Sequence, residues 1–164
     1  MNPSPINFID ESAQIGRGSV VWHFAIIAQD VVIGENCSIG SRVEIGRGSR
    51  IGNGSRIGSG TFLPPNSTVG ENVFIGPNST FCDDKNPYVG NLNYYAQPPI
   101  IEDRANIGAH VVVLPGITIG SNALIGAGAI VTNDVPPNRL VRGEPSRLRV
   151  PAERKRDFPV LRST

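Results

Sequence analysis

The sequence predicts an all-β fold, a parallel β-helix of six-residue repeats with one long inserted loop and a short basic C-terminal segment. Three observations lead to this prediction. An aliphatic side chain recurs every six residues, a small or β-branched residue follows it four positions later, and glycine, asparagine or aspartate often precedes that residue. This period fits neither an amphipathic helix, which repeats about every 3.6 residues, nor a strand that alternates every second residue.

Residues 9–80 form the first block of repeats. Glycine, asparagine and aspartate tolerate the positive φ that a sharp corner needs, so each repeat is expected to turn the chain by a fixed angle. Three repeats then close one triangular coil, and each coil buries its aliphatic side chains only against its neighbours. The twelve aliphatic positions are Ile9, Ile15, Val21, Ile27, Ile33, Ile39, Ile45, Ile51, Ile57, Leu63, Val69 and Ile75.

A long loop, residues 82–100, separates this block from a second block at 101–136. The loop holds all three tyrosines of the protein and the pair Asp83 and Asp84. Long loops inside a regular architecture are usually functional, which predicts an active-site loop. The alternative is a strap that only holds subunits together. The repeat resumes with Ile101, Ile107, Val113, Ile119, Ile125 and Val131.

The C-terminal segment, residues 137–164, carries eight basic and three acidic residues, against seven basic and eleven acidic in residues 1–136. Because arginine pairs bidentately with phosphate, this asymmetry favours a polyphosphate ligand. A solubilising tail is the alternative. The 164 residues fit a single domain.

Composition excludes several classes of protein. A charged fraction of 18% and a net charge of +1 give no reason to expect nucleic-acid or membrane partners. Two cysteines are too few for a disulfide framework, and no apolar run reaches the length of a membrane span. The N-terminus has no secretory signal, so we expect a cytoplasmic protein.

Two histidines exclude a three-histidine zinc centre, and we expect no metal. His110 falls at a corner position, where histidine tolerates positive φ, although a substrate contact stays open. His23 lies beside Trp22 and Phe24, which indicates either ligand binding or subunit packing. Cys37 occupies an inward repeat position, and Cys82 has no evident base to activate it as a nucleophile.

Asp83 and Asp84 stand where the coil ends and the loop begins. Acyl transfer to an amine requires a neutral, oriented amine, and a carboxylate accepts its proton or its hydrogen bond. We therefore assign these two residues as catalytic. The alternative is a pair that merely starts a turn.

The sequence resembles the hexapeptide-repeat acyltransferases over about residues 9–150, which implies a left-handed β-helix. The stretch Val21–Phe24 and the run from Gly76 to Pro87 are similar to the nucleotide-sugar N-acetyltransferases of that group, especially enzymes that acetylate 3-amino sugars linked to UDP or dTDP. The run from Ile125 to Pro136, followed by Arg142–Arg147, is similar to their CoA-binding end.

The resemblance implies acetyl-CoA as co-substrate, a nucleotide-sugar acceptor used in surface polysaccharide synthesis, and a homotrimer with active sites between subunits. Asp83 matches the position that contacts the sugar amine. The expected substrate contacts are His23, Phe24, Asn86, Tyr94, Tyr95 and His110. The expected acetyl-CoA contacts are Gly108, Ala109, Gly126, Ala127, Ala129, Thr132, Arg142 and Arg147. Among these, the small residues would lie along pantetheine and the arginines would bind the phosphates. A backbone N–H near Gly108 or Ala109 would stabilise the oxyanion.

Two departures bear on the identity of the sugar. Aspartate stands at 83 where those enzymes usually carry asparagine, and residues 87–100 lack the basic residues of the uronic-acid enzymes. An O-acetyltransferase acting on a sugar or serine is the alternative enzyme, but residues 81–100 contain no histidine to serve as its base. A non-catalytic solenoid that only assembles with partners is the alternative of another class.

Overall fold

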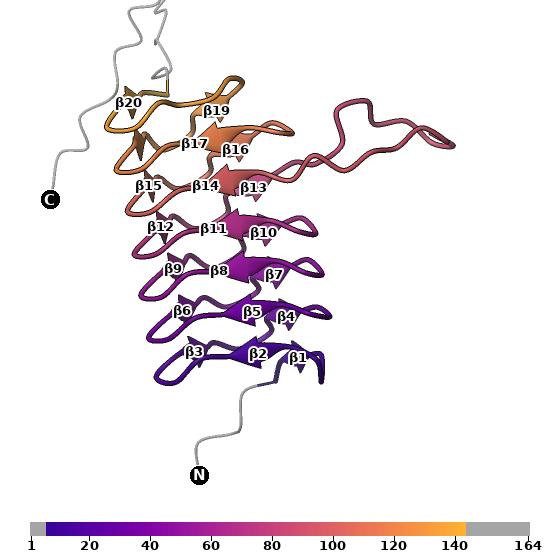
Figure 1. Cartoon of the computed structure of the whole chain (residues 1–164), viewed down its shortest axis with the longest axis vertical. Helices are drawn as coiled ribbons and strands as arrows, with labels where there is room; N and C mark the ends of the chain where they lie inside the picture. The colour runs from indigo at the N-terminus through magenta and orange to yellow at the C-terminus, as the bar shows by residue number, and fades with distance from the viewer. Residues whose placement is uncertain (1–5, 144–164) are drawn as a thin grey trace, which may run out of the picture.

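Twenty two-residue strands wind through residues 6–143, the part of the chain that this computed structural model describes. They form a parallel β-solenoid of about seven turns, with three flat sheets as its walls (Figure 1). Neighbouring coils pair 18 residues apart, as in Ile33 with Ile51 and Ile51 with Val69. The described residues contain no helix.

Each sheet takes every third strand of the chain. Sheet A contains β1 (Phe8–Ile9), β4 (Ile26–Ile27), β7 (Glu44–Ile45), β10 (Phe62–Leu63), β13 (Thr80–Phe81), β16 (Val112–Val113) and β19 (Ile130–Val131). Sheet B contains β2 (Gln14–Ile15), β5 (Val32–Ile33), β8 (Arg50–Ile51), β11 (Thr68–Val69), β14 (Ile100–Ile101) and β17 (Thr118–Ile119). Sheet C contains β3 (Val20–Val21), β6 (Ser38–Ile39), β9 (Arg56–Ile57), β12 (Phe74–Ile75), β15 (Asn106–Ile107), β18 (Leu124–Ile125) and β20 (Leu140–Val141).

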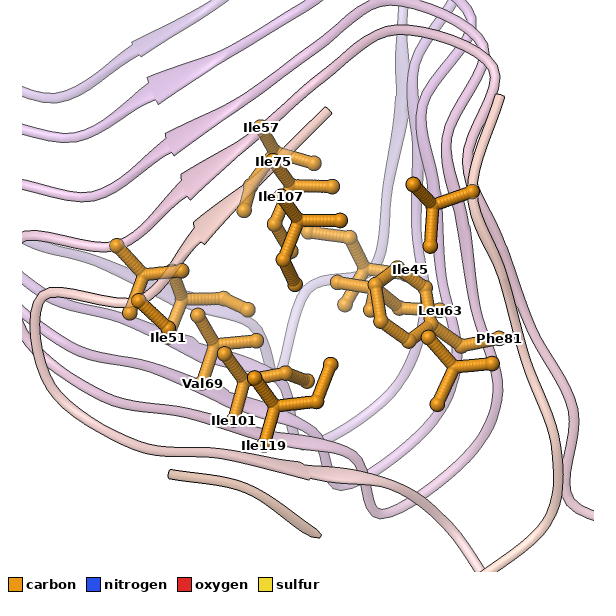
Figure 2. Packing of buried hydrophobic residues seen from close by; sticks show 14 of the residues in the cluster. Ile45, Ile51, Ile57, Leu63, Val69, Ile75, Phe81, Ile101, Ile107 and Ile119 are labelled. Atoms are coloured by element: carbon orange, nitrogen blue, oxygen red, sulfur yellow. The ribbon is translucent and has the colours of Figure 1, made fainter. Parts of the chain in front are cut away.

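The core is three columns of aliphatic side chains, one from each sheet, that meet at the solenoid axis (Figure 2). In sheet A the column runs through Ile45, Leu63 and Phe81, all fully buried. The second residue of every strand from β4 to β19 has a side chain that points inward and is buried. The predicted six-residue aliphatic repeat is therefore confirmed as the core.

The first coil differs from this prediction. Ile9 and Ile15 remain 40% and 38% exposed, although both belong to the aliphatic repeat. No coil lies below them among the described residues, so one side of each side chain has no neighbour. The aliphatic pattern marks the inward direction but does not ensure burial at the end of a solenoid.

Hydroxyl side chains line the interior of the corners without loss of hydrogen bonds. Ser49, Ser55, Thr61, Ser67 and Ser79 are fully buried. The Ser55 hydroxyl donates to the Gly70 carbonyl at 2.8 Å and accepts from the Val73 N–H at 3.0 Å. Among residues 6–143, no buried side-chain N or O atom is left without a hydrogen-bond partner. Burial of these hydroxyls is thus compatible with a stable core, because an unpaired buried hydroxyl costs about 1–3 kcal/mol.

The corners turn on residues with positive φ, as the sequence predicts. Asn72 has a φ of 54° and His110 a φ of 55°, each at the third position after the aliphatic residue. The solenoid also continues beyond the predicted end at residue 136. Val135 bridges to Ile119, and β20 pairs with β18, because Leu140 and Val141 restore an apolar pair after an irregular spacing that a six-residue count misses.

Candidate active site

The loop of residues 82–99 leaves the solenoid at the corner between β13 and β14 and extends sideways, away from the coils (Figure 1). Val69 pairs with Ile101, 32 residues later, whereas Ile51 pairs with Val69 over the usual 18. The loop therefore adds 14 residues to one coil without changing the stacking above and below it. Most residues of this loop are exposed or half-buried and so are available to a site on the surface, whereas Pro99 is buried.

Hydrogen bonds clamp the two ends of the loop to each other and to the next coil. The Gln97 N–H donates to the Asp83 carbonyl oxygen at 2.8 Å, and the Gly116 N–H donates to the Gln97 carbonyl oxygen at 2.8 Å. The Tyr94 hydroxyl donates to Asp83 Oδ2 at 2.9 Å. Asp83 is thereby held by two residues of the returning part of the loop, and among residues 6–143 no donor contacts its second carboxylate oxygen, Oδ1.

Asp84 has a different environment from Asp83. Its Oδ1 accepts a hydrogen bond from the Asn86 N–H at 2.9 Å, which closes a tight turn. Its side chain also lines a pocket of about 540 Å³ between the loop and the corners that follow β16 and β19. The other lining residues are Cys82, Lys85, Pro87, Gln97, Leu114, Pro115, Gly116, Ile117, Thr132, Asn133 and Asp134.

Two groups beside Asp83 have raised pKa values. Partial burial, followed by the charge of Asp83, raises the pKa of the Cys82 thiol. The hydrogen bond to Asp83 raises the pKa of Tyr94, because the carboxylate stabilises the protonated phenol. Both groups are therefore neutral at neutral pH. A protonated Cys82 is a poor nucleophile, since the thiolate is the reactive form.

Small residues predicted to contact CoA meet on a second part of the surface, the corner between sheets C and A. Gly108 and Gly126 occupy equivalent positions in successive coils, and a Cβ on Gly108 would lie 2.4 Å from the Ala127 nitrogen. A Cβ on Gly126 would meet the next turn of the chain less closely, with the Val141 carbonyl oxygen at 3.2 Å and the Arg142 Cα at 3.4 Å. Gly108, Gly126 and Ala127 also line a shallow groove of about 350 Å³ with Phe74 and Leu124. This surface has room for a ligand against the backbone.

Four predicted acetyl-CoA contacts require comment. The side chain of Ala129 is buried in the core, so a contact of that side chain with pantetheine is wrong; the position is the inward one that follows each corner. Thr132 lies in the pocket under the loop and not on the Gly108–Ala127 surface. Arg142 is exposed at the end of β20, and Arg147 lies outside the described residues.

The two candidate oxyanion donors, the Gly108 and Ala109 N–H groups, differ in whether they already have a hydrogen-bond acceptor. The Gly108 N–H donates to the Ile125 carbonyl oxygen at 2.8 Å within the sheet ladder, so it is not available. The Ala109 N–H has no backbone acceptor among residues 6–143. Ala109 is thus the better placed of the two.

The structure brings together only part of the predicted substrate contacts. Asn86, Tyr94 and Tyr95 lie on the loop with Asp83, whereas His110 sits at the sheet C–A corner, where its Nε2 lies 3.4 Å from Asn78 Nδ2. His23 and Phe24 lie at that same corner four coils lower, with ring centroids 6.1 Å apart. Strands in a sheet are about 4.8 Å apart, so roughly 19 Å separates the two histidines. One chain does not join these groups into a single cavity.

Sequence reasoning did not identify the clamp of Gln97 and Gly116 or the pocket walls formed by Leu114 and Pro115. The repeat position of Gly116 could have indicated its contact with the loop, because Gly116 is the corner residue in the coil directly above the loop. Gln97 carries no such signal, since its contribution is made through its backbone. Residues 6–143 contain no group of three histidine, cysteine or acidic side chains able to hold a metal ion. They also contain no helix able to cross a membrane.

Comparison with known proteins adds the family. Residues 12–47 and 48–83 match the bacterial transferase hexapeptide family (six repeats), and residues 98–133 match the hexapeptide repeat of succinyl-transferase. The galactoside O-acetyltransferase of Escherichia coli K12 is 50% identical over 58 residues, which is 35% of this chain and 29% of that protein. The chain spans between 22% and 32% of the length of such curated relatives.

Two solved structures are similar over most of the chain. One is PerB from Caulobacter crescentus in complex with CoA and GDP-perosamine, with 26% identity, a TM-score of 0.61, and coverage of 85% of this chain and 55% of that one. The other is a hexapeptide-repeat acetyltransferase from Vibrio cholerae in complex with acetyl coenzyme A, with 26% identity, a TM-score of 0.59, and coverage of 82% and 68%.

Proposed function

The chain belongs to the hexapeptide-repeat transferases, and from this premise we propose that it is an acetyl-CoA-dependent N-acetyltransferase acting on a nucleotide-linked amino sugar of surface polysaccharide synthesis. The observation that carries the proposal is the fixed carboxylate of Asp83. Tyr94 occupies Oδ2, so Oδ1 is free to accept a proton or a hydrogen bond from an amine. PerB, whose structure holds CoA and a nucleotide-linked amino sugar, is similar to this chain over 85% of its length.

In this mechanism Asp83 orients the neutral amine and takes the proton that the nitrogen loses as the new C–N bond forms. The Ala109 N–H of a neighbouring subunit, whose sheet C–A corner faces this loop in the homotrimer proposed below, stabilises the charge on the carbonyl oxygen of the thioester. The C–S bond then breaks, and the proton held by Asp83 passes to the departing sulfur. We infer that the amine attacks the thioester directly, without an acyl-enzyme, since partial burial raises the pKa of the Cys82 thiol and so disfavours it as a nucleophile.

The Gly108–Ala127 surface supports a place for acetyl-CoA. At Gly108, Ala109, Gly126 and Ala127 no side chain is longer than alanine, so an extended pantetheine arm can lie against the backbone there, beside the exposed His110. Arg142, at the upper end of this surface, supplies a guanidinium for the phosphates, and arginine suits phosphate because it binds two oxygens at once. The basic residues of segment 137–164 add positive charge near the same end of the sequence.

We expect Ala127→Phe to raise the KM for acetyl-CoA by about tenfold or more, as the lost contact and the clash together exceed about 1.4 kcal/mol. Ala127 is exposed, so the variant should unfold at the temperature of the wild type. The control is Gln29→Phe, which places the same ring at the equivalent exposed position of another corner. Equal KM values in both variants would place acetyl-CoA elsewhere.

We further propose that the active unit is a homotrimer with sites between subunits. The loop tip exposes apolar side chains that touch nothing in their own chain, with Val89 and Leu92 104% and 96% exposed. Sheet A adds Phe8, Ile26 and Ile130 on its outer face. Exposed apolar side chains at the loop tip and on sheet A favour a contact between proteins.

Light scattering of the purified chain is expected to give about three times the 17.5 kDa of one copy. Val89→Asp together with Leu92→Asp should reduce the trimer fraction and the activity in parallel, because charged side chains oppose burial of the tip. The matched control is the same double change to alanine, which keeps the tip uncharged. A monomeric wild type with full activity would overturn the proposal.

The test of the proposed function is release of free CoA from acetyl-CoA in the presence of amino sugars linked to UDP, dTDP or GDP. O-acetylation is the second candidate, because galactoside O-acetyltransferase shares 50% identity over part of the chain. The panel therefore includes the matching hydroxy sugars and free galactosides. Turnover of an amino sugar alone supports the proposal, and turnover of the hydroxy compounds alone supports O-acetylation.

A further inference from the structure

An open groove of about 530 Å³ lies on the outer face of sheet C, over the first three coils and away from the loop. Its walls are Trp22 and Arg56, and its floor is the backbone of Gly40 and Gly58. Its volume falls within the usual range for small-ligand sites, about 300–1,000 Å³. None of the catalytic or acetyl-CoA residues described above lies in it.

Trp22 breaks a regular column of glycines. The position directly after each sheet C strand is glycine in the next five coils, at Gly40, Gly58, Gly76, Gly108 and Gly126. In the first coil that position is Trp22, which is 52% exposed. Packing within the chain does not account for so large an exposed ring, whereas a ligand that stacks on its free face does.

Gly40 and Gly58 line the groove without side chains of their own. A Cβ on Gly40 would lie 2.5 Å from the Ser59 nitrogen, and one on Gly58 would lie 2.5 Å from the Pro77 nitrogen. These atoms belong to the next coil, so the stacking of the coils requires glycine at both positions, and no side chain at 40 or 58 covers the indole of Trp22. Ser38, Ser41 and Ser59 line the groove with hydroxyl groups.

Arg56 supplies the charge of the groove. It is the outward residue of β9, exposed on the face of sheet C. Within the part of the chain that the structure describes, no carboxylate forms an ion pair with it, and its guanidinium makes no hydrogen bond to another side chain. An unpaired guanidinium beside an exposed aromatic ring matches a ligand that is both aromatic and anionic.

We propose that this groove binds a nucleoside diphosphate, with the base on Trp22, the diphosphate on Arg56 and the serine hydroxyls around the ribose. The inference rests on the proposed function in that the nucleotide is the carrier of the amino sugar. Asp83 lies on another corner of the same chain, so the amine of a carrier bound here would have to reach the Asp83 of a neighbouring copy. This agrees with a site completed by two subunits.

The experiment uses the fact that Trp22 is the only tryptophan of the chain, so indole fluorescence reports on this groove alone. UDP, dTDP and GDP are titrated into the full chain without acetyl-CoA, and inorganic pyrophosphate serves as the ligand without a base. We expect a saturable change in emission with at least one nucleotide and none with pyrophosphate. Arg56→Gln should weaken that binding by about tenfold or more, as expected for a lost charged hydrogen bond.

The matched control is Arg50→Gln, an exposed arginine of the same coil on sheet B, which should bind as the wild type does. The groove is ruled out if no nucleotide changes the emission at millimolar concentration, or if Arg56→Gln and the wild type bind equally. A blue-shifted, quencher-resistant emission without nucleotide response would instead assign Trp22 to a subunit contact. Failure of acetyl transfer in the sugar panel leaves this measurement unaffected, so the two proposals fail separately.

Discussion

Replacing Asp83 with asparagine is expected to lower kcat with the amino sugar by about 10²–10⁴-fold, the usual contribution of a general base. Asparagine keeps the size of the side chain and its acceptor for the Tyr94 hydroxyl, so the change removes the charge and little else. KM for acetyl-CoA should stay as it is, because the Gly108–Ala127 surface lies on another corner. The measurement is initial rate of CoA release over both substrates.

Two further variants make this result specific. Asp30→Asn changes an exposed aspartate at a corner of positive φ, where asparagine fits equally well, and should leave kcat unchanged. Asp84→Asn keeps the oxygen that accepts from the Asn86 N–H, so it tests the charge of the second aspartate alone. An Asp83→Asn enzyme that turns over at the wild-type rate would reduce Asp83 to a residue that only orients the amine.

Truncation of Phe81 to alanine is expected to lower the free energy of unfolding by about 3–5 kcal/mol, the range for large aromatic side chains in cores. Phe81 is fully buried, stands in register with Val113 above it, and is the largest side chain in the sheet A column. A cavity there separates the coils on either side of the loop. Because neighbouring coils stabilise each other, the loss is expected to affect the whole solenoid.

Denaturant unfolding at one fixed protein concentration measures this effect, since assembly also contributes to apparent stability. Thr80→Ala is the control, because the adjacent Thr80 side chain points outward and is exposed. It should change the free energy of unfolding by less than about 0.5 kcal/mol. A Phe81→Ala variant as stable as Thr80→Ala would mean that the coils above the loop do not depend on this contact.

The regular parts of the fold follow from the sequence because one local rule repeats. Inward aliphatic residues such as Leu63, and corner residues such as Asn72, occur at fixed spacing, and three repeats close a coil. The exceptions lie where the rule meets an end. Ile9 and Ile15 lack a coil below them, and β20 follows an irregular turn after Val131.

The candidate site was less predictable. The tyrosine-rich loop and its aspartate pair stand out because they interrupt the repeat, and this predicts Asp83 and Tyr94 as site residues. Their hydrogen bond joins residues eleven apart in an irregular loop, and no periodicity encodes it. Ala129 illustrates the opposite error, in which a small residue that matches a family pattern points into the core. Contacts made through the backbone, as at Gln97, leave no trace in residue type.

The pairing of Val69 with Ile101 across the loop bears on how proteins of this kind diversify. The scaffold registers its coils on either side of the insertion as if the extra residues were absent, so a change of loop length or sequence costs the solenoid little. The loop between Phe81 and Ile100 can therefore be replaced during evolution, and the acceptor preference can change with it. The Gly108–Ala127 surface stays the same in such a replacement. A chimaera that carries another protein's loop between these anchors should keep its stability and take the donor's acceptor.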